Sequence, residues 1–268
     1  MDISTATPTA VSIALGISLL AGLSTGFGGL IVALKRSPGA TFLAGALGFS
    51  AGVMVYISFV ELLPEGIDGL AEAGAARAEL WGTVAFFAGI AVIACIDRLV
   101  PEEINPHEEP SRLGVSKARM RNVGVLSAIA IAIHNFPEGF ATFAVALADP
   151  AMAIPLAIAI AIHNIPEGIA VAVPLREATG SRRNAAWWAT LSGLAEPLGA
   201  IVGYLLLRPF LGPQTLGLTF AAIAGIMVFV SLDKLLPTAI QTGKNHATIY
   251  GMIAGMAVMA VSLLLLPG

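Results

Sequence analysis

The chain has 268 residues and a formal net charge of −3, and 57% of its residues are apolar while only 12% are charged. Its mean hydropathy is +0.86, whereas soluble domains carry about 25% charged residues. A soluble core of this length cannot hold so much apolar surface, so the composition indicates a membrane protein. The charge balance argues against a nucleic-acid partner, and the single cysteine excludes an internal disulfide and a cysteine-based zinc site.

The first apolar run follows residues 1–9, which contain no Lys or Arg. A cleaved signal peptide begins with positive charge, so we expect this run to be retained as a span. A helix that crosses a bilayer needs about 20 mainly apolar residues. Eight segments predict an all-α polytopic protein whose residues 1–268 form one transmembrane domain: 10–34, 41–63, 80–100, 124–148, 151–175, 185–208, 215–240 and 247–267.

The basic residues predict how these spans are oriented. Eight spans divide the loops into two alternating sets, and Arg77 and Arg208 are the only basic residues of one set. The other set contains Lys35, Arg36, Arg98, Arg112, Lys117, Arg119, Arg121, Arg176, Arg182, Arg183, Lys234 and Lys244. Cytoplasmic loops carry the excess of positive charge. We therefore expect both termini outside and the polar loop 101–122 in the cytoplasm.

A six-residue motif occurs twice in consecutive spans, as HNFPEG from His134 and as HNIPEG from His163. In each copy a glutamate, Glu138 or Glu167, follows the histidine by four residues. Residues at this spacing share one face of a helix. The short link between the two spans makes them antiparallel neighbours, so four ligands could enclose one divalent cation of the zinc type. Buried carboxylates are costly in a membrane, which argues against a packing role.

Each motif also contains a proline, Pro137 or Pro166. A proline removes a backbone N–H and presses on the carbonyl four residues earlier. Transporters often build ion sites where helices are interrupted at mid-membrane. We therefore predict that the fourth and fifth helices are broken at the centre of the protein.

Further acidic residues occur in other spans. Glu196 lies in the segment GLAEPLG of the sixth span, where it could supply a ligand from a third helix. Glu61, Asp97 and Asp233 lie near the ends of the second, third and seventh spans. They could mark an ion path, although a position at the membrane interface explains each of them equally well.

A weaker sequence repeat relates the second and seventh spans, which contain FVELLP at 59–64 and FVSLDKLLP at 229–237. The two spans run in opposite directions in the predicted topology. This similarity is therefore of the kind that an inverted repeat produces.

The paired motif, the eight spans and the GLAEPLG segment together resemble the ZIP family of metal-ion transporters over essentially the whole chain. The resemblance implies a multi-pass protein of the bacterial inner membrane that takes up zinc, and related ions such as Fe, Mn, Co and Cd, into the cytoplasm. It also implies a homodimer, no enzymatic activity, and no cofactor besides the transported metal.

The resemblance further implies which residues bind metal. The four motif residues, His134, Glu138, His163 and Glu167, would form a primary site. A second, adjoining ion would share the two glutamates and add three ligands: Asn135, Asn164 and Glu196. The chain departs from many relatives in having an amide at Asn164 where they have an acid, and only His107 where they have a His-rich loop.

The sequence also bears on other functional classes of membrane protein. The zinc-protease motif H-E-x-x-H and the phosphate-binding G-x-x-x-x-G-K-[ST] are both absent from the sequence. An intramembrane di-metal enzyme would more usually carry Glu-x-x-His pairs. A divalent-cation exporter stays open, because the ligands do not determine the direction of transport.

Overall fold

The computed structural model describes residues 7–34, 39–99, 117–148, 150–207 and 212–264. Every element within these residues is a helix, and η2 and η5 are single π-helical turns. In chain order the elements are α1 Pro8–Leu34, α2 Ala40–Ile57, η2 Ser58–Leu62, α3 Leu63–Glu72, α4 Ala78–Leu99, α5 Lys117–Ala148, α6 Pro150–Thr179, α7 Arg182–Gly193, α8 Ala195–Leu207, α9 Pro213–Val230, η5 Ser231–Leu235, α10 Leu236–Gln241 and α11 Asn245–Leu264.

Each predicted span corresponds to one of these helices or to a run of consecutive elements, which confirms the all-α class. The second span continues through η2 and α3 to Glu72, and the sixth is divided into α7 and α8 at Leu194. Helix α5 begins at Lys117, before the predicted start at 124, so the predicted loop 101–122 is shorter at its end. The rest of that loop, including His107, lies outside the described residues.

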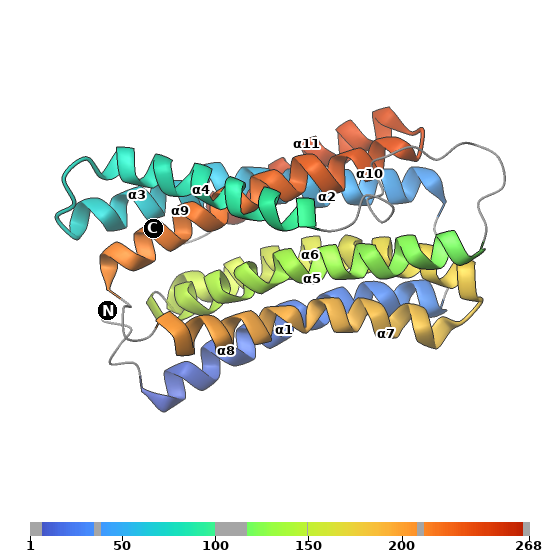
Figure 1. The fold of residues 1–268 in the computed structure, drawn as a ribbon, viewed down its shortest axis with the longest axis horizontal. Helices are drawn as coiled ribbons and strands as arrows, with labels where there is room; N and C mark the ends of the chain where they lie inside the picture. Colours follow the sequence, from blue (N-terminus) through green and yellow to red (C-terminus); the bar gives the residue numbers. More distant parts are fainter. Residues whose placement is uncertain (1–6, 35–38, 100–116, 149, 208–211, 265–268) are drawn as a thin grey trace.

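The helices form two groups that lie side by side (Figure 1). One group contains α1, α5, α6, α7 and α8, and the other contains α2, α3, α4, α9, α10 and α11. Between the groups the most extensive packing is that of α2 against α6. Both copies of the repeated motif therefore lie in the first group, on α5 and α6, and α6 packs against α2 of the second group.

The predicted inverted repeat appears as two matching π turns. Ser58 opens η2 and Ser231 opens η5. Each serine is buried, and each hydroxyl donates to the carbonyl of the methionine four residues earlier at 2.7 Å. Gly66 of α3 packs beside Ala221 of α9, whereas the later Gly69 packs toward the earlier Pro213. The two segments are thus antiparallel, as an inverted repeat requires.

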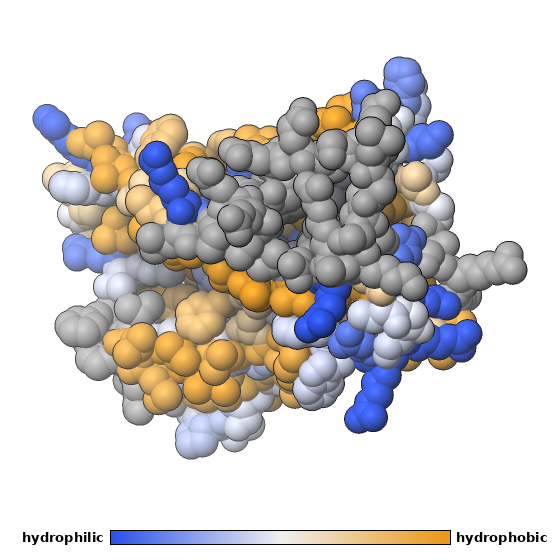
Figure 2. All heavy atoms as spheres, turned by 45° about the vertical axis from the view of Figure 1, so that its right-hand side comes forward, coloured by the Kyte–Doolittle hydropathy of each residue, from blue (hydrophilic) through white to orange (hydrophobic). Residues whose placement is uncertain are grey.

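The outer surface is that of a membrane protein. Large apolar side chains such as Leu20, Phe27, Leu206 and Leu264 are more than half exposed. Figure 2 shows broad areas of apolar side chains, with hydrophilic ones toward the edges of that face. In the part of the chain that the structure describes, seven helices are long and apolar enough to cross a membrane. The protein is therefore a multi-pass membrane protein.

The predicted fifth span corresponds to α6, a helix of 30 residues. It is not among those seven membrane-length apolar helices. The count of eight crossings and the outward placement of both termini therefore stay predictions.

The prediction that the fourth and fifth helices are broken was wrong. Helix α5 continues through Pro137, and α6 continues through Pro166. One proline removes only one backbone hydrogen bond, and neighbouring helices can hold a membrane helix together at such a position. The interruptions fall instead at the two π turns and at Leu194.

Candidate metal site

The repeated motifs meet where α5 packs against α6. His134 Nε2 lies 3.1 Å from Glu167 Oε2, and His163 Nε2 lies 2.7 Å from Glu138 Oε1. All four side chains are at most 3% exposed. The i, i+4 spacing predicted one imidazole and one carboxylate from each helix in a common volume, and the structure brings the four together. Each histidine hydrogen-bonds to the glutamate of the opposite helix.

These cross-helix contacts determine what a cation must do to bind. Within the described residues, no three His, Cys, Asp or Glu side chains are placed so that they could already hold a metal ion. An imidazole nitrogen that donates its N–H to a carboxylate has no lone pair available for a metal. A dication that binds here therefore replaces the two His–Glu contacts with bonds to itself.

A second set of polar side chains adjoins the first. The amide nitrogen of Asn164 donates to Glu196 Oε1 and, at 3.2 Å, to the carbonyl of Ala21 on α1. The amide nitrogen of Asn135 donates to the carbonyl of Ser192 on α7 at 3.4 Å. Both amides thus donate to protein groups, while their carbonyl oxygens accept no hydrogen bond.

Several side-chain oxygens of the two sets are unpaired. Asn135 Oδ1, Asn164 Oδ1, Glu138 Oε2 and Glu196 Oε2 are buried and have no hydrogen-bond partner in the protein. A buried polar atom without a partner costs about 1–3 kcal/mol. Oxygens are the atoms through which amides and carboxylates bind cations. The four atoms lie on three helices, α5, α6 and α8.

Glycines of the two motifs bring further helices close to this site. A Cβ atom added to Gly139 would collide with the backbone of Glu196 on α8. A Cβ atom added to Gly168 would collide with the carbonyl of Thr25 on α1. The final glycine of each motif is therefore where a neighbouring helix crosses at backbone contact. The prediction from sequence treated only the His, Asn, Pro and Glu of each motif as informative.

Ser50 is a polar contact that the sequence did not single out. Its hydroxyl on α2 donates to Glu167 Oε1 at 3.1 Å, and the residue is fully buried. It lies in a run of small residues typical of close helix packing. Only the packing of α2 on α6 distinguishes it from its neighbours. Through Ser50 the second helix group touches the site.

Two of the three acids predicted to mark a path, Asp97 and Asp233, form a separate cluster. Lys234 of η5 contacts Asp97 of α4, and its ammonium lies 3.1 Å from Asp233 Oδ2. The structure thus brings these two acids together around a lysine, which already neutralises one of their charges. Glu61 lies on η2 and is partly exposed.

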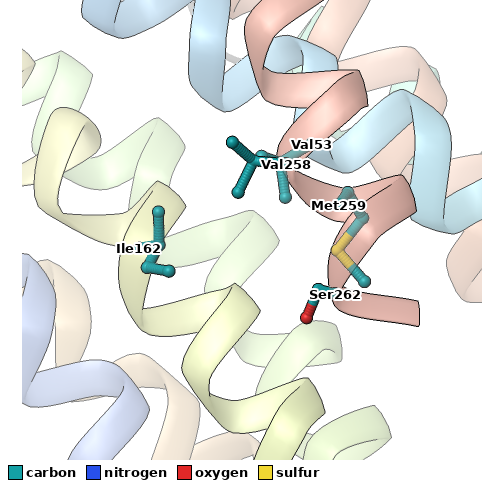
Figure 3. Close-up of a pocket in the computed structure, with 5 residues that line it drawn as sticks. All are labelled: Val53, Ile162, Val258, Met259 and Ser262. Carbon is teal, nitrogen blue, oxygen red and sulfur yellow. The ribbon is translucent and has the colours of Figure 1, made fainter. Parts of the chain in front are cut away.

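A small apolar pocket lies between α6 and the second helix group (Figure 3). Ile162, next to His163 in the chain, faces Val53 of α2 and Val258 and Met259 of α11 across it. Its volume of about 10 Å³ has room for one water molecule at most. The lining is apolar apart from Ser262, so this pocket offers no metal shell.

Comparison with known proteins places the chain in a family. The family model described as "ZIP Zinc transporter" matches residues 98–263. "Zinc transporter ZupT" of Corynebacterium efficiens is 64% identical over 94% of this chain and 96% of that protein. Proteins of the same name from Corynebacterium glutamicum and Streptococcus mutans are 64% and 53% identical, over 94% and 93% of this chain and 98% and 96% of their own lengths. The chain therefore belongs to the ZIP zinc transporter family.

Proposed function

We propose that this protein carries zinc across the bacterial inner membrane into the cytoplasm, through the site formed by α5 and α6. The observation that supports this most directly is the pair of buried His–Glu contacts across the two helices. Two imidazoles and two carboxylates are a ligand set that zinc accepts. The relatives reported above, whose names describe zinc transporters, share at least 53% of their aligned residues with this chain.

The charges of the site give a reason why the cargo is a dication. Glu138, Glu167 and Glu196 are at most 1% exposed. Buried carboxylates are strongly unfavourable unless a positive charge accompanies them. A divalent cation supplies two charges at once and can bond to several of the carboxylate oxygens. The same ligand types also accept Fe²⁺, Mn²⁺, Co²⁺ and Cd²⁺, and we include these ions in the proposal as lesser cargo.

The remaining details belong to the same proposal. His134, Glu138, His163 and Glu167 hold the primary ion, and Asn135, Asn164 and Glu196 add the ligands of a second. The unpaired amide and carboxylate oxygens support this second position. We also propose a homodimer with both termini outside, and an ion path past Glu61, Asp97 and Asp233.

Transport by the purified protein tests the function. The protein is reconstituted in liposomes, zinc is added on one side, and a zinc-sensitive dye is enclosed on the other. We expect zinc to enter faster than in protein-free liposomes and to be slowed by an excess of Cd²⁺. Zinc flux equal to that of protein-free liposomes would contradict the proposal. A second measurement uses cells whose cytoplasm has been loaded with zinc. If these cells lose zinc when the protein is expressed, the protein is an exporter.

Zinc binding is expected to weaken as the pH falls. Metal binds the neutral imidazole and the ionised carboxylate, so binding releases protons. Acid protonates His134 and His163, and a protonated imidazole also binds the opposite glutamate more strongly than a neutral one does. Equilibrium dialysis of the purified protein at about pH 5.5 and about pH 7.5, on either side of the imidazole range, measures the effect. Tighter binding at the lower pH would contradict this prediction.

The predicted topology has a direct test with cysteines on described loops. Ala76, in the turn between α3 and α4, and Asn245, at the start of α11, are both exposed. In a background with Cys95→Ser, we expect an impermeant thiol reagent to label the Ala76→Cys variant from outside intact cells. The Asn245→Cys variant should be labelled only after the membrane is opened. Labelling of both cysteine variants in intact cells would exclude the predicted topology of eight crossings.

A further inference from the structure

One buried hydroxyl differs from all the others that the structure describes. The hydroxyl of Thr25 on α1 is fully buried and has no hydrogen-bond partner. The other buried Ser and Thr side chains in the described residues, namely Ser18, Ser50, Ser58, Thr142, Ser192, Ser231 and Thr248, all donate to an acceptor. Most of these acceptors are carbonyls of the preceding helical turn, which is the usual solution for a hydroxyl in a membrane helix.

Thr25 cannot use that solution, because its acceptor is occupied. The carbonyl four residues before Thr25 belongs to Ala21. That oxygen already accepts from the Ser24 hydroxyl at 2.5 Å and from the Asn164 amide at 3.2 Å. A carbonyl oxygen has two lone pairs, and in a helix this one also faces the backbone N–H of Thr25. The Thr25 O–H is therefore left without this acceptor, and no donor reaches the lone pairs of its oxygen either.

The position of Thr25 places this hydroxyl beside the second set of ligands. Its Cβ lies only 2.9 Å from where a Cβ on Gly193 would stand, so the side chain leaves α1 toward the end of α7. Gly22, which shares that face of α1, lies against Gly193 and against Glu196 Cβ. The turn of α1 that carries Thr25 thus crosses the junction of α7 and α8, next to Glu196 in the first turn of α8.

The other unpaired oxygens are concentrated in the same region. Among the described residues, the buried side-chain oxygens without a hydrogen bond are Thr25 Oγ1, Asn135 Oδ1, Glu138 Oε2, Asn164 Oδ1, Glu196 Oε2 and Asp233 Oδ2. The last of these lies 3.1 Å from the Lys234 ammonium and so has an ion-pair partner. The other five come from α1, α5, α6 and α8, and four of them belong to residues of the proposed metal site.

We propose that the Thr25 hydroxyl is a ligand of the second metal ion, beside Asn164 and Glu196. The inference rests on the proposed function, since it adds a ligand to that same site. A neutral hydroxyl oxygen adds one more oxygen ligand to the second ion without adding negative charge. It also compensates in part for the neutral amide of Asn164, which binds a dication less strongly than a carboxylate does.

Replacing the hydroxyl while keeping the side-chain shape tests the proposal. Equilibrium dialysis of the purified protein measures the affinities for the first and the second equivalent of zinc separately. We expect Thr25→Val to weaken the second equivalent about tenfold, to leave the first unchanged, and to be rescued by Thr25→Ser. Thr248→Val is the matched control, because Thr248 is equally buried but bonds to the carbonyl of Lys244. Unchanged binding of the second equivalent to Thr25→Val would overturn the proposal.

A spectroscopic variant separates contact with the metal from a change in packing. In the Cys95→Ser background, the Thr25→Cys variant places a thiol where the hydroxyl stood. We expect added Co²⁺ to produce a thiolate-to-metal charge-transfer band that is lost on the further change Glu196→Ala. Absence of the band in a folded variant that binds two equivalents of Co²⁺ would also overturn the proposal. A wrong assignment of the primary site would give a different result. In that case the His134→Ala variant would bind the first equivalent of zinc normally.

Discussion

Replacing Glu138 or Glu167 by alanine is expected to reduce zinc uptake by about 100-fold or more, and replacing His134 or His163 nearly as much. Each of the four contacts a partner on the opposite helix. Removing one leaves an incomplete ligand shell and also leaves its former partner buried without that contact. The glutamates should be the more sensitive, because they supply the negative charge and are shared with the second ion. Uptake is measured per molecule of transporter in the membrane.

The same experiment separates the two proposed ions. Asn135→Ala and Asn164→Ala remove neutral ligands of the second ion, so we expect slower uptake or an altered choice of metal. Glu196→Ala should have an intermediate effect, because it removes a charge that lies on a third helix. The control is Glu79→Ala, since Glu79 is an exposed acid in the first turn of α4. This variant should transport normally.

Two outcomes would change this account. Normal uptake by the double variant Glu138→Ala, Glu167→Ala would exclude the proposed site altogether. Complete loss of uptake from Asn164→Ala would show instead that the two ion positions act as one obligatory centre. Abundance must be unchanged in either case, because a carboxylate or amide removed from a buried cluster can also destabilise the fold.

The chemistry of the site could be predicted from the sequence because it depends on local spacing. A histidine and a glutamate four residues apart share a helix face whatever the rest of the fold does. Two such pairs on adjacent antiparallel helices must then approach each other. The partner that each residue contacts could not be predicted. The hydrogen bond between His134 and Glu167 depends on the rotation and vertical offset of α5 against α6, which no short-range pattern encodes.

The helix interruptions show a second limit, which comes from the position of each proline within a turn. Pro64 and Pro237 lie in the first turn of α3 and α10, and Pro197 lies in the first turn of α8. Pro197 follows the turn at Leu194, where the first N–H groups of α8 have no internal acceptor and a proline costs no hydrogen bond. Pro64 and Pro237 instead follow the π turns, within backbone that is helical on both sides. Pro137 and Pro166 are interior, yet their helices continue. Proline alone therefore did not indicate where a helix breaks.

Ser50 and Thr25 could not be found from sequence for a third reason. Both lie on helices whose only visible signal was a pattern of small residues, which predicts close packing but not what is packed. Each becomes informative only through a contact that is distant in the chain. The hydroxyl of Ser50 reaches Glu167, and the usual acceptor of Thr25 is taken by Asn164.

Adding a single methyl group at the last residue of either motif is expected to damage the protein severely. The new Cβ of Gly168→Ala would overlap the Thr25 carbonyl, and that of Gly139→Ala would overlap the Glu196 backbone. Overpacking usually costs about 1–3 kcal/mol. Here the obstacle is backbone rather than a side chain that can rotate away, so we expect about 3 kcal/mol or more of lost stability. Thermal unfolding of the purified protein in detergent measures this loss.

Gly16→Ala is the matched control, because Gly16 is also a helix glycine but a Cβ there would meet nothing within 4 Å. Alanine is favoured over glycine in a helix by about 0.5–1 kcal/mol, so this variant should be as stable as the wild type or slightly more so. The sign of the effect thus reverses between positions of identical chemistry. The folded fraction of Gly139→Ala should also transport zinc poorly, because moving α8 outward carries Glu196 away from Asn164. Equal stability of Gly168→Ala and Gly16→Ala would show that α1 does not cross α6 at backbone contact.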